Sequence, residues 1–332
     1  AYTNLGLGYE SIDDLHRAIT AYQYALEFAP GQVKALKRLG AIRYKQGQAG
    51  EAVALLQQAQ GAATDDRGIA YATILALQLD DQFAAAITAC QKALAAKPSA
   101  DLYNLLGECY EESAQTEPAL AAYRQSLYLD PNFAPAHRGL ARLSGQAGHY
   151  QTAFASIEKI IALGQADTHD YADLGNLYFR TGARAEAEAA YREAIHLDPG
   201  QAASHHDLAV VLRTLQRPDE AAEALARAVA LKPDNSEYHY KLGSLALEQK
   251  QIQAAQQNLN TAIELGTENS YAYLFLGRLY QEQGESEKAL HHYTQLLTSP
   301  TLNVDGRVRT QLKTYLQQID HDEARNLIKR FY

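Results

Sequence analysis

The sequence lacks several features that mark common classes of protein. Of its 332 residues only two are cysteines, none is methionine or tryptophan, and no apolar run is long enough to span a bilayer. Cys90 and Cys109 are too few for a disulfide framework and do not have metal-site spacing, so we expect two small buried thiols. Without a run of about 20 apolar residues, we expect no direct membrane insertion. The lack of Met and Trp has no evident physical reason.

Basic residues are fewer than acidic residues. The chain has 30 Lys and Arg residues against 39 Asp and Glu residues, which gives a formal net charge of −9. Proteins that bind nucleic acid usually present a clear basic surface to the phosphate backbone. The charge balance therefore predicts that nucleic acid is not the partner.

Proline is infrequent, but its nine copies recur at regular intervals. Pro30 and Pro98 are 68 residues apart, and Pro199 and Pro233 are 34 residues apart. A period of about 34 residues that holds two helical patterns is typical of a stacked helical repeat. Because each repeat in such a stack contacts only its neighbours, a chain of this length needs no single large core.

Nine units result when the chain is aligned on its Leu-Gly pairs and prolines. One alanine recurs in the second helical segment of every unit, at Ala18, Ala52, Ala86, Ala119, Ala153, Ala187, Ala221, Ala255 and Ala289. We expect this small residue to let two helix backbones approach closely, while a Tyr or Leu four residues later fills the space beside it. Gly47, Gly148, Gly182 and Gly284 share one position between the two helices, where a left-handed residue is favoured.

The pattern resembles the tetratricopeptide repeat family over residues 1 to about 301. In the fourth unit the landmark residues of that family stand at Leu106, Gly107, Tyr110, Ala119, Tyr123 and Pro131. The match is weaker in the third unit, where Thr73 and Ile74 replace Leu-Gly, and in the fifth, where Gln165 replaces proline. The resemblance implies an all-α, right-handed superhelical solenoid of about nine antiparallel helix pairs.

Two domains are expected. Residues 1–303 would form the solenoid, with its first repeat truncated at the start, and residues 304–332 would form capping helices. The landmarks are lost in the last segment although helical spacing continues, and basic residues such as Arg307 and Lys313 give it a polar outer face. A terminal repeat needs such a face because it would otherwise expose an apolar flank. A basic docking site is the alternative interpretation of this segment.

The resemblance also implies where a partner would bind, because the first helix of each repeat in this family lines a concave groove. The corresponding positions predict the partner-binding residues Lys34, Lys37, Tyr44, Asn104, Glu108, Arg138, Arg142, Asn176, His206, Arg213, Tyr240 and Arg278. Basic and acidic groups alternate in bands along this lining, which would suit a peptide whose own charges alternate. The alternative is that these side chains simply form solvated helix faces.

Nothing in the sequence indicates catalysis or a cofactor. There is no Gly-rich phosphate loop, nucleophile elbow or Cys-x-x-Cys motif. His169, Asp173 and His206 are the best candidates for a metal site, but they lack a fourth ligand, so no metal is predicted. We expect His291 and His292 to face solvent.

The sequence therefore predicts a non-enzymatic scaffold that binds a peptide or helical segment of a protein partner in its groove. One alternative is an assembly or regulatory segment of a larger secretion, polysaccharide-export or membrane-associated machine. Another is self-association through the terminal repeats. Because the first residues already lie inside a repeat, we expect the native N-terminus to be missing. We favour the cytoplasm, and the missing N-terminus keeps the periplasm as an alternative compartment.

Overall fold

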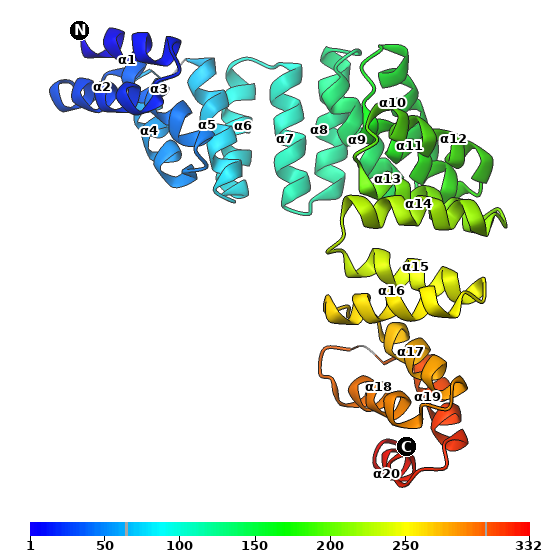
Figure 1. The fold of residues 1–332 in the computed structure, drawn as a ribbon. Helices are drawn as coiled ribbons and strands as arrows, with labels where there is room; N and C mark the ends of the chain where they lie inside the picture. The colour runs from blue at the N-terminus through cyan, green and yellow to red at the C-terminus, as the bar shows by residue number, and fades with distance from the viewer. Residues whose placement is uncertain (64–65, 303) are drawn as a thin grey trace. The chain divides into compact units, whose positions relative to one another are not determined.

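The computed structural model of the protein describes residues 1–63, 66–302 and 304–332. Within these ranges the chain forms 20 α-helices and no strand, which confirms the predicted all-α class. The helices divide into two compact units, residues 1–166 and residues 167–332. In each unit the helices follow one another in chain order (Figure 1).

Ten helices belong to each unit. The first unit contains α1 (Tyr2–Ser11), α2 (Leu15–Phe28), α3 (Val33–Lys45), α4 (Ala49–Ala62), α5 (Arg67–Leu79), α6 (Phe83–Ala96), α7 (Ala100–Glu112), α8 (Thr116–Leu129), α9 (Ala134–Gln146) and α10 (Tyr150–Ala162). The second contains α11 (Thr168–Thr181), α12 (Arg184–Leu197), α13 (Ala202–Thr214), α14 (Pro218–Leu231), α15 (Ser236–Glu248), α16 (Ile252–Glu264), α17 (Ser270–Glu282), α18 (Ser286–Thr298), α19 (Gly306–Gln318) and α20 (Asp322–Phe331).

Odd-numbered and even-numbered helices have different neighbours. Each odd-numbered helix from α1 to α17 packs on the even-numbered helix that follows it, and these pairs are the predicted repeats. Odd-numbered helices also contact one another, α3 with α5, α5 with α7 and α7 with α9 in the first unit, and α15 with α17 and α17 with α19 in the second. In each unit we call the surface formed by these odd-numbered helices the odd-helix face.

Small residues bring the two helices of a repeat together, as the sequence predicts. All nine recurring alanines have no exposed surface. The glycine of the Leu-Gly pair contributes as well, because it leaves room for the aromatic ring of the second helix. A Cβ atom on Gly107 would lie 2.6 Å from Cε1 of Tyr123, and one on Gly139 of the next repeat would lie 2.3 Å from Cζ of the same ring. Tyr123, which is 1% exposed, therefore fits only between two helices that carry glycine at the contact.

The turns between paired helices have a left-handed residue in all nine repeats. Gly47, Gly148, Gly182 and Gly284 adopt φ angles between 73° and 85°, which confirms the sequence prediction. The same position in the other five repeats is occupied by Asp13, Asp81, Ala114, Gln216 and Lys250, with φ between 54° and 61°. Residues with a Cβ atom are disfavoured in this region. The fold therefore imposes one backbone geometry on turns of different sequence.

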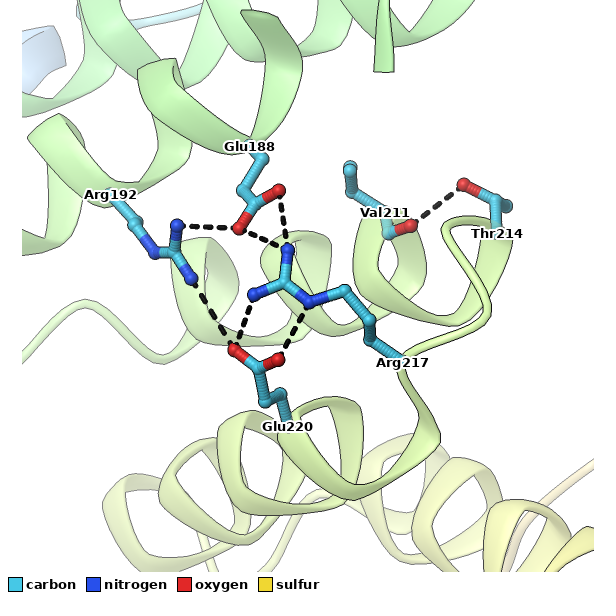
Figure 2. A network of polar contacts seen from close by, with 6 residues as sticks. All are labelled: Glu188, Arg192, Val211, Thr214, Arg217 and Glu220. Atoms are coloured by element: carbon cyan, nitrogen blue, oxygen red, sulfur yellow. Dashed lines mark hydrogen bonds and ion pairs between the residues drawn. The ribbon is translucent and has the colours of Figure 1, made fainter. Parts of the chain in front are cut away.

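A polar cluster ties consecutive repeats together in the second unit (Figure 2). The guanidinium of Arg217, just before α14, donates from Nη1 to both carboxylate oxygens of Glu188 on α12, at 2.7 and 2.8 Å, and from Nε to Glu220 at 2.6 Å. Arg192 approaches both carboxylates as well. Glu188 is only 7% exposed, so these arginines supply the countercharge that a buried carboxylate requires. Hydrogen bonding to Arg217 lowers the pKa of the Glu220 carboxyl.

The C-terminal helices continue the stacking although they lack the repeat landmarks. The α19 helix contacts α17, as successive odd-numbered helices do in the preceding repeats, and α20 contacts α18. Leu312 and Leu316 of α19 are buried in a cluster with Tyr293 and Leu296 of α18. These contacts cover the flank of the last repeat, as the predicted cap would. The predicted domain boundary falls at residue 303, which lies outside the described residues.

Candidate functional site

The predicted partner-binding residues all lie on odd-numbered helices. In the first unit they are Lys34, Lys37 and Tyr44 on α3, Asn104 and Glu108 on α7, and Arg138 and Arg142 on α9. In the second unit they are Asn176 on α11, His206 and Arg213 on α13, Tyr240 on α15 and Arg278 on α17. The odd-helix face of each unit is therefore the surface on which these side chains can be compared.

Two of the predicted cations in the first unit form ion pairs across repeats. The Nζ atom of Lys37 lies 3.0 Å from Oδ1 of Asp66, the residue that caps α5. This contact lowers the pKa of the Asp66 carboxyl. Arg142 on α9 donates from Nη2 to Oε2 of Glu111 on α7, at 2.8 Å. The basic and acidic bands of the sequence thus partly neutralise each other.

The predicted cations of the second unit are also paired, one across repeats and one within a helix. Nη2 of Arg213 on α13 lies 2.7 Å from Oε1 of Glu248 on α15, and Nε of Arg278 lies 2.7 Å from Oε1 of Glu282 within α17. All four side chains remain about half exposed. Exposed pairs of this kind contribute about 0–1 kcal/mol, so a charged partner could replace either member at little cost.

The other predicted residues differ in how accessible they are. Asn104 and Tyr240 are buried, 6% and 9% exposed, so neither offers a broad contact surface. Asn176 is exposed and accepts a 2.8 Å hydrogen bond from the hydroxyl of Tyr191. His206 stacks on the ring of Tyr238, with 5.2 Å between the ring centroids. Repeat position alone did not show that Asn104 and Tyr240 are buried beneath the odd-helix face.

Arg138, Glu108 and Tyr44 are half-buried, while Lys34 is exposed. The guanidinium of Arg138 donates from Nη2 to the backbone oxygen of Gln165, at 2.7 Å. This bond links α9 to the segment that follows α10. The side chain of Arg138 therefore has a role in holding the repeats together as well as facing the surface.

The odd-helix face of the second unit has a cavity of about 690 Å³ between α15 and α17. Its apolar walls are formed by Leu247, Ile252, Phe275 and Leu279. Its charged and polar lining consists of Ser244, Glu248, Lys250, Arg278 and Glu282. We call this the α15–α17 cavity. A mainly apolar hollow with a few charges beside it is the usual form of a binding pocket.

Two cavities open on the odd-helix face of the first unit. One, of about 520 Å³, is lined by Lys34, Lys37 and Arg38 together with Asp66. The other, of about 360 Å³, extends across α3, α5 and α7 and carries acidic side chains. A further cavity of about 420 Å³ lies between the C-terminal ends of α4 and α6 and the first turns of α5 and α7.

The apolar walls of the α15–α17 cavity were missed by the sequence analysis, which selected polar and aromatic residues. Leu247 and Phe275 stand on the same faces of α15 and α17 as predicted residues, but they are apolar. Leu247 stands at a groove-facing repeat position, and an apolar residue there is the signal that would have found one wall of the cavity.

Histidines and cysteines do not assemble into a site in the described part of the chain. In those ranges no three His, Cys, Asp or Glu side chains lie close enough to share a metal ion. His291 is exposed as predicted, but the prediction for His292 is wrong, because this ring is half-buried and stacks on Tyr280. Burial lowers the pKa of His292 to about 4. The predicted burial of both cysteines is confirmed.

No helix in residues 1–63, 66–302 and 304–332 has the length and apolar character needed to cross a membrane.

Comparison with protein families identifies the repeats. Models described as tetratricopeptide repeat match residues 3–67, 100–133, 178–245 and 240–301. Superkiller protein 3 of Schizosaccharomyces pombe is 27% identical over 204 residues. That match includes 58% of this chain but only 14% of the yeast protein, so the chain spans a small part of that relative.

Solved structures with the same fold cover the chain more fully. A tetratricopeptide repeat protein from Parabacteroides merdae superposes with a TM-score of 0.58 and 18% identity, over 74% of this chain and 97% of the other. A chain of the APC/C hetero-tetramer Cut9-Hcn1 superposes with a TM-score of 0.54 and 18% identity. The match covers 93% of this chain and 60% of the other. Pseudomonas aeruginosa pilF superposes with a TM-score of 0.53 and 22% identity, and the match covers 59% of this chain and 90% of the other. At these identities the likeness concerns the fold alone.

Proposed function

Because the chain belongs to the tetratricopeptide repeat family, whose repeats generally mediate protein–protein interactions, we propose that it is a non-enzymatic scaffold for a peptide or helical segment of a protein partner. The odd-helix face is the proposed binding surface. The twelve residues predicted from the sequence belong to this proposal, with the α15–α17 cavity added as its apolar anchor point.

The α15–α17 cavity is the observation that carries the proposal. Its volume of about 690 Å³ accommodates a large apolar side chain, and Leu247, Phe275 and Leu279 supply the wall contacts. Burying one such side chain contributes about 1.5–3 kcal/mol, which corresponds to a roughly 10- to 150-fold gain in affinity. Binding energy at interfaces is concentrated in a few anchors of this type.

Charged groups around the cavity would set the orientation of the partner. Glu248, Arg278 and Glu282 lie at its lining, and their present pairs are exposed. A partner with an apolar anchor flanked by charges of both signs could exchange with these pairs. Such complementarity affects register and association rate more than total affinity.

A substitution that fills the α15–α17 cavity tests the proposal. Peptides would be selected from a random phage-displayed library with the whole chain as bait, and their dissociation constants measured by fluorescence anisotropy. Ser244→Phe places an aromatic ring in the cavity without removing a core contact, and Gln257→Phe places the same ring on the exposed side of α16 as a control. We expect at least tenfold weaker binding for Ser244→Phe and less than a twofold change for Gln257→Phe. Equal affinities for the two variants would contradict the proposal.

A second candidate is an assembly segment of a larger complex. One protein of the same fold, a chain of the Cut9-Hcn1 hetero-tetramer, is itself a subunit of such a complex, and the likeness in fold extends over 93% of this chain. Native mass spectrometry of the tagged natural protein, isolated from its own cells, distinguishes the two candidates. A complex of fixed stoichiometry that survives dilution favours assembly, and recovery of the uncomplexed protein favours transient peptide binding.

A further inference from the structure

The acidic cavity of the first unit has a composition unlike the other two on the odd-helix face. Its lining residues come from three successive repeats and the turns beside them: Tyr44, Leu75, Gln78, Leu79, Asp81, Phe83, Glu108 and Glu112. Three are carboxylates and none is a cation. Among the described residues no Lys, Arg or His nitrogen lies within 4.0 Å of these three carboxylates, whereas Glu111 on the same helix is paired with Arg142.

Glu108 is the carboxylate most removed from water. It is half-buried, and its burial raises the pKa of the carboxyl, although hydrogen bonds from Asn104 and Gln78 and the charge of Arg142 act in the opposite direction. Its Oε1 accepts a 2.8 Å hydrogen bond from Nδ2 of Asn104. A carboxylate that is partly desolvated and has no cation in direct contact gains from an incoming one.

Asn104 adds a second, independent observation. Its side chain is 94% buried, and its Oδ1 atom accepts no hydrogen bond from the described residues. A buried carbonyl oxygen without a donor costs about 1–3 kcal/mol, so it is normally satisfied. The amide nitrogen of the same side chain is bonded to Glu108, so Asn104 positions a carboxylate that lines the cavity.

We propose that this cavity binds an arginine side chain of the partner peptide. The inference rests on the proposed scaffold function and names the chemistry that one of its subsites recognises. The observation behind it is a cavity with apolar and aromatic walls, whose three carboxylates form no ion pair with any described residue.

The shape and chemistry of arginine fit these walls. Its aliphatic stem can pack along Leu75 and Leu79, and the flat guanidinium can stack on the ring of Tyr44. Its five N–H donors are enough for Glu108 and Glu112 at the same time. Lysine has three donors on a point charge and no flat face. The cavity therefore favours arginine among the basic side chains.

The metal alternative is excluded for the described residues by spacing, since no three carboxylates, histidines or cysteines there converge on one point. Separated carboxylates suit an extended guanidinium better than a single ion. The neighbouring cavity of the same unit, lined by Lys34, Lys37 and Arg38, has the opposite charge. A peptide lying along this face would thus place an acidic residue near α3 and the arginine between α5 and α7.

The test uses the smallest probe that carries the proposed group. Nα-acetyl-arginine N-methylamide and its neutral isostere, Nα-acetyl-citrulline N-methylamide, would be titrated into the whole ¹⁵N-labelled chain and followed by NMR. Glu108→Gln removes the charge at the cavity but keeps the shape. Glu117→Gln makes the same change on the exposed first turn of α8 and matches the net charge.

We expect saturable shifts for amides of α3, α5 and α7 with the arginine probe, and at least tenfold weaker binding of the citrulline probe. Glu108→Gln should weaken arginine binding at least fivefold, and Glu117→Gln by less than 1.5-fold. Glu112→Gln, at an exposed lining residue, is the second variant if Glu108→Gln alters the fold. Equal binding of the two probes, or equal effects of Glu108→Gln and Glu117→Gln, would overturn the inference. Either failure leaves the separate test at Ser244 intact, so the two proposals can fail independently.

Discussion

Replacing Ala114 by glycine should make the protein more stable, although alanine is usually the better residue near a helix. Ala114 follows α7 and adopts a φ of 58°, in the left-handed region. In four other repeats glycine occupies this position with the same handedness. The Cβ atom of alanine is crowded there by the following carbonyl, and glycine removes that crowding.

The expected magnitude follows from two opposing terms. A residue with a Cβ atom in the left-handed region costs about 1–2 kcal/mol, and glycine loses about 0.5–1 kcal/mol more backbone entropy on folding. The net gain for Ala114→Gly is therefore about 0.5–1 kcal/mol. Ala147 provides a matched control, because it is also an exposed residue at the end of a first helix but has a φ of −74°. For Ala147→Gly we expect a loss of up to about 1 kcal/mol.

Thermal unfolding of the whole chain, followed by circular dichroism at 222 nm, measures both variants under the same conditions. A gain of this size raises the midpoint by about 1–4 °C in a unit of this length, and the control should lower it. If Ala114→Gly lowers the midpoint as much as Ala147→Gly does, the left-handed turn does not carry the strain that we assign to it.

Three further predictions concern packing, charge and pH. Gly139→Ala should destabilise the protein by about 1–2 kcal/mol, because its new methyl would lie 2.3 Å from a buried tyrosine ring. Gly8→Ala, where the added methyl would have nothing within 4 Å, should be neutral or stabilising in the same denaturation assay. Glu188→Ala should lower the free energy of unfolding by about 1–3 kcal/mol in urea titrations, because two arginines contact its buried carboxylate. Glu237→Ala, which breaks an exposed pair within one helix, should lower it by about 0.5 kcal/mol or less. The pKa of His292 is lowered to about 4 in the folded chain. Between pH 6.5 and 4 the unfolded chain therefore binds a proton that the folded chain does not, and stability falls on acidification. The midpoint of thermal unfolding should accordingly drop less from pH 7 to pH 4.5 in His292→Phe than in the natural chain.

The repeat architecture was predictable because its determinants are local and periodic. The recurring alanines and the Leu-Gly pairs mark contacts between helices about a dozen residues apart, and all nine alanines are buried. The four turn glycines also indicate their own backbone geometry. The turns at Asp13, Ala114 and Gln216 could not be recognised in this way, because their left-handed conformation is imposed by the packed helix pair and not by the residue.

The candidate site was predictable only in position. Repeat position placed all twelve residues on odd-numbered helices, but it could not show that Lys37 contacts Asp66 or that Arg213 contacts Glu248. Such pairs join residues about one repeat apart, and they depend on the rotation of one repeat relative to the next. The same rotation determines whether a hollow forms between two helices, as at Phe275.

Photo-crosslinking tests the central claim, that the odd-helix face holds the partner, most directly. A library-selected peptide with benzoylphenylalanine at its apolar anchor would be irradiated with the whole chain, and the attachment site identified by mass spectrometry. We predict attachment to Leu247, Phe275 or Leu279 in the α15–α17 cavity. Attachment confined to even-numbered helices at residues outside this cavity would contradict the proposed binding surface.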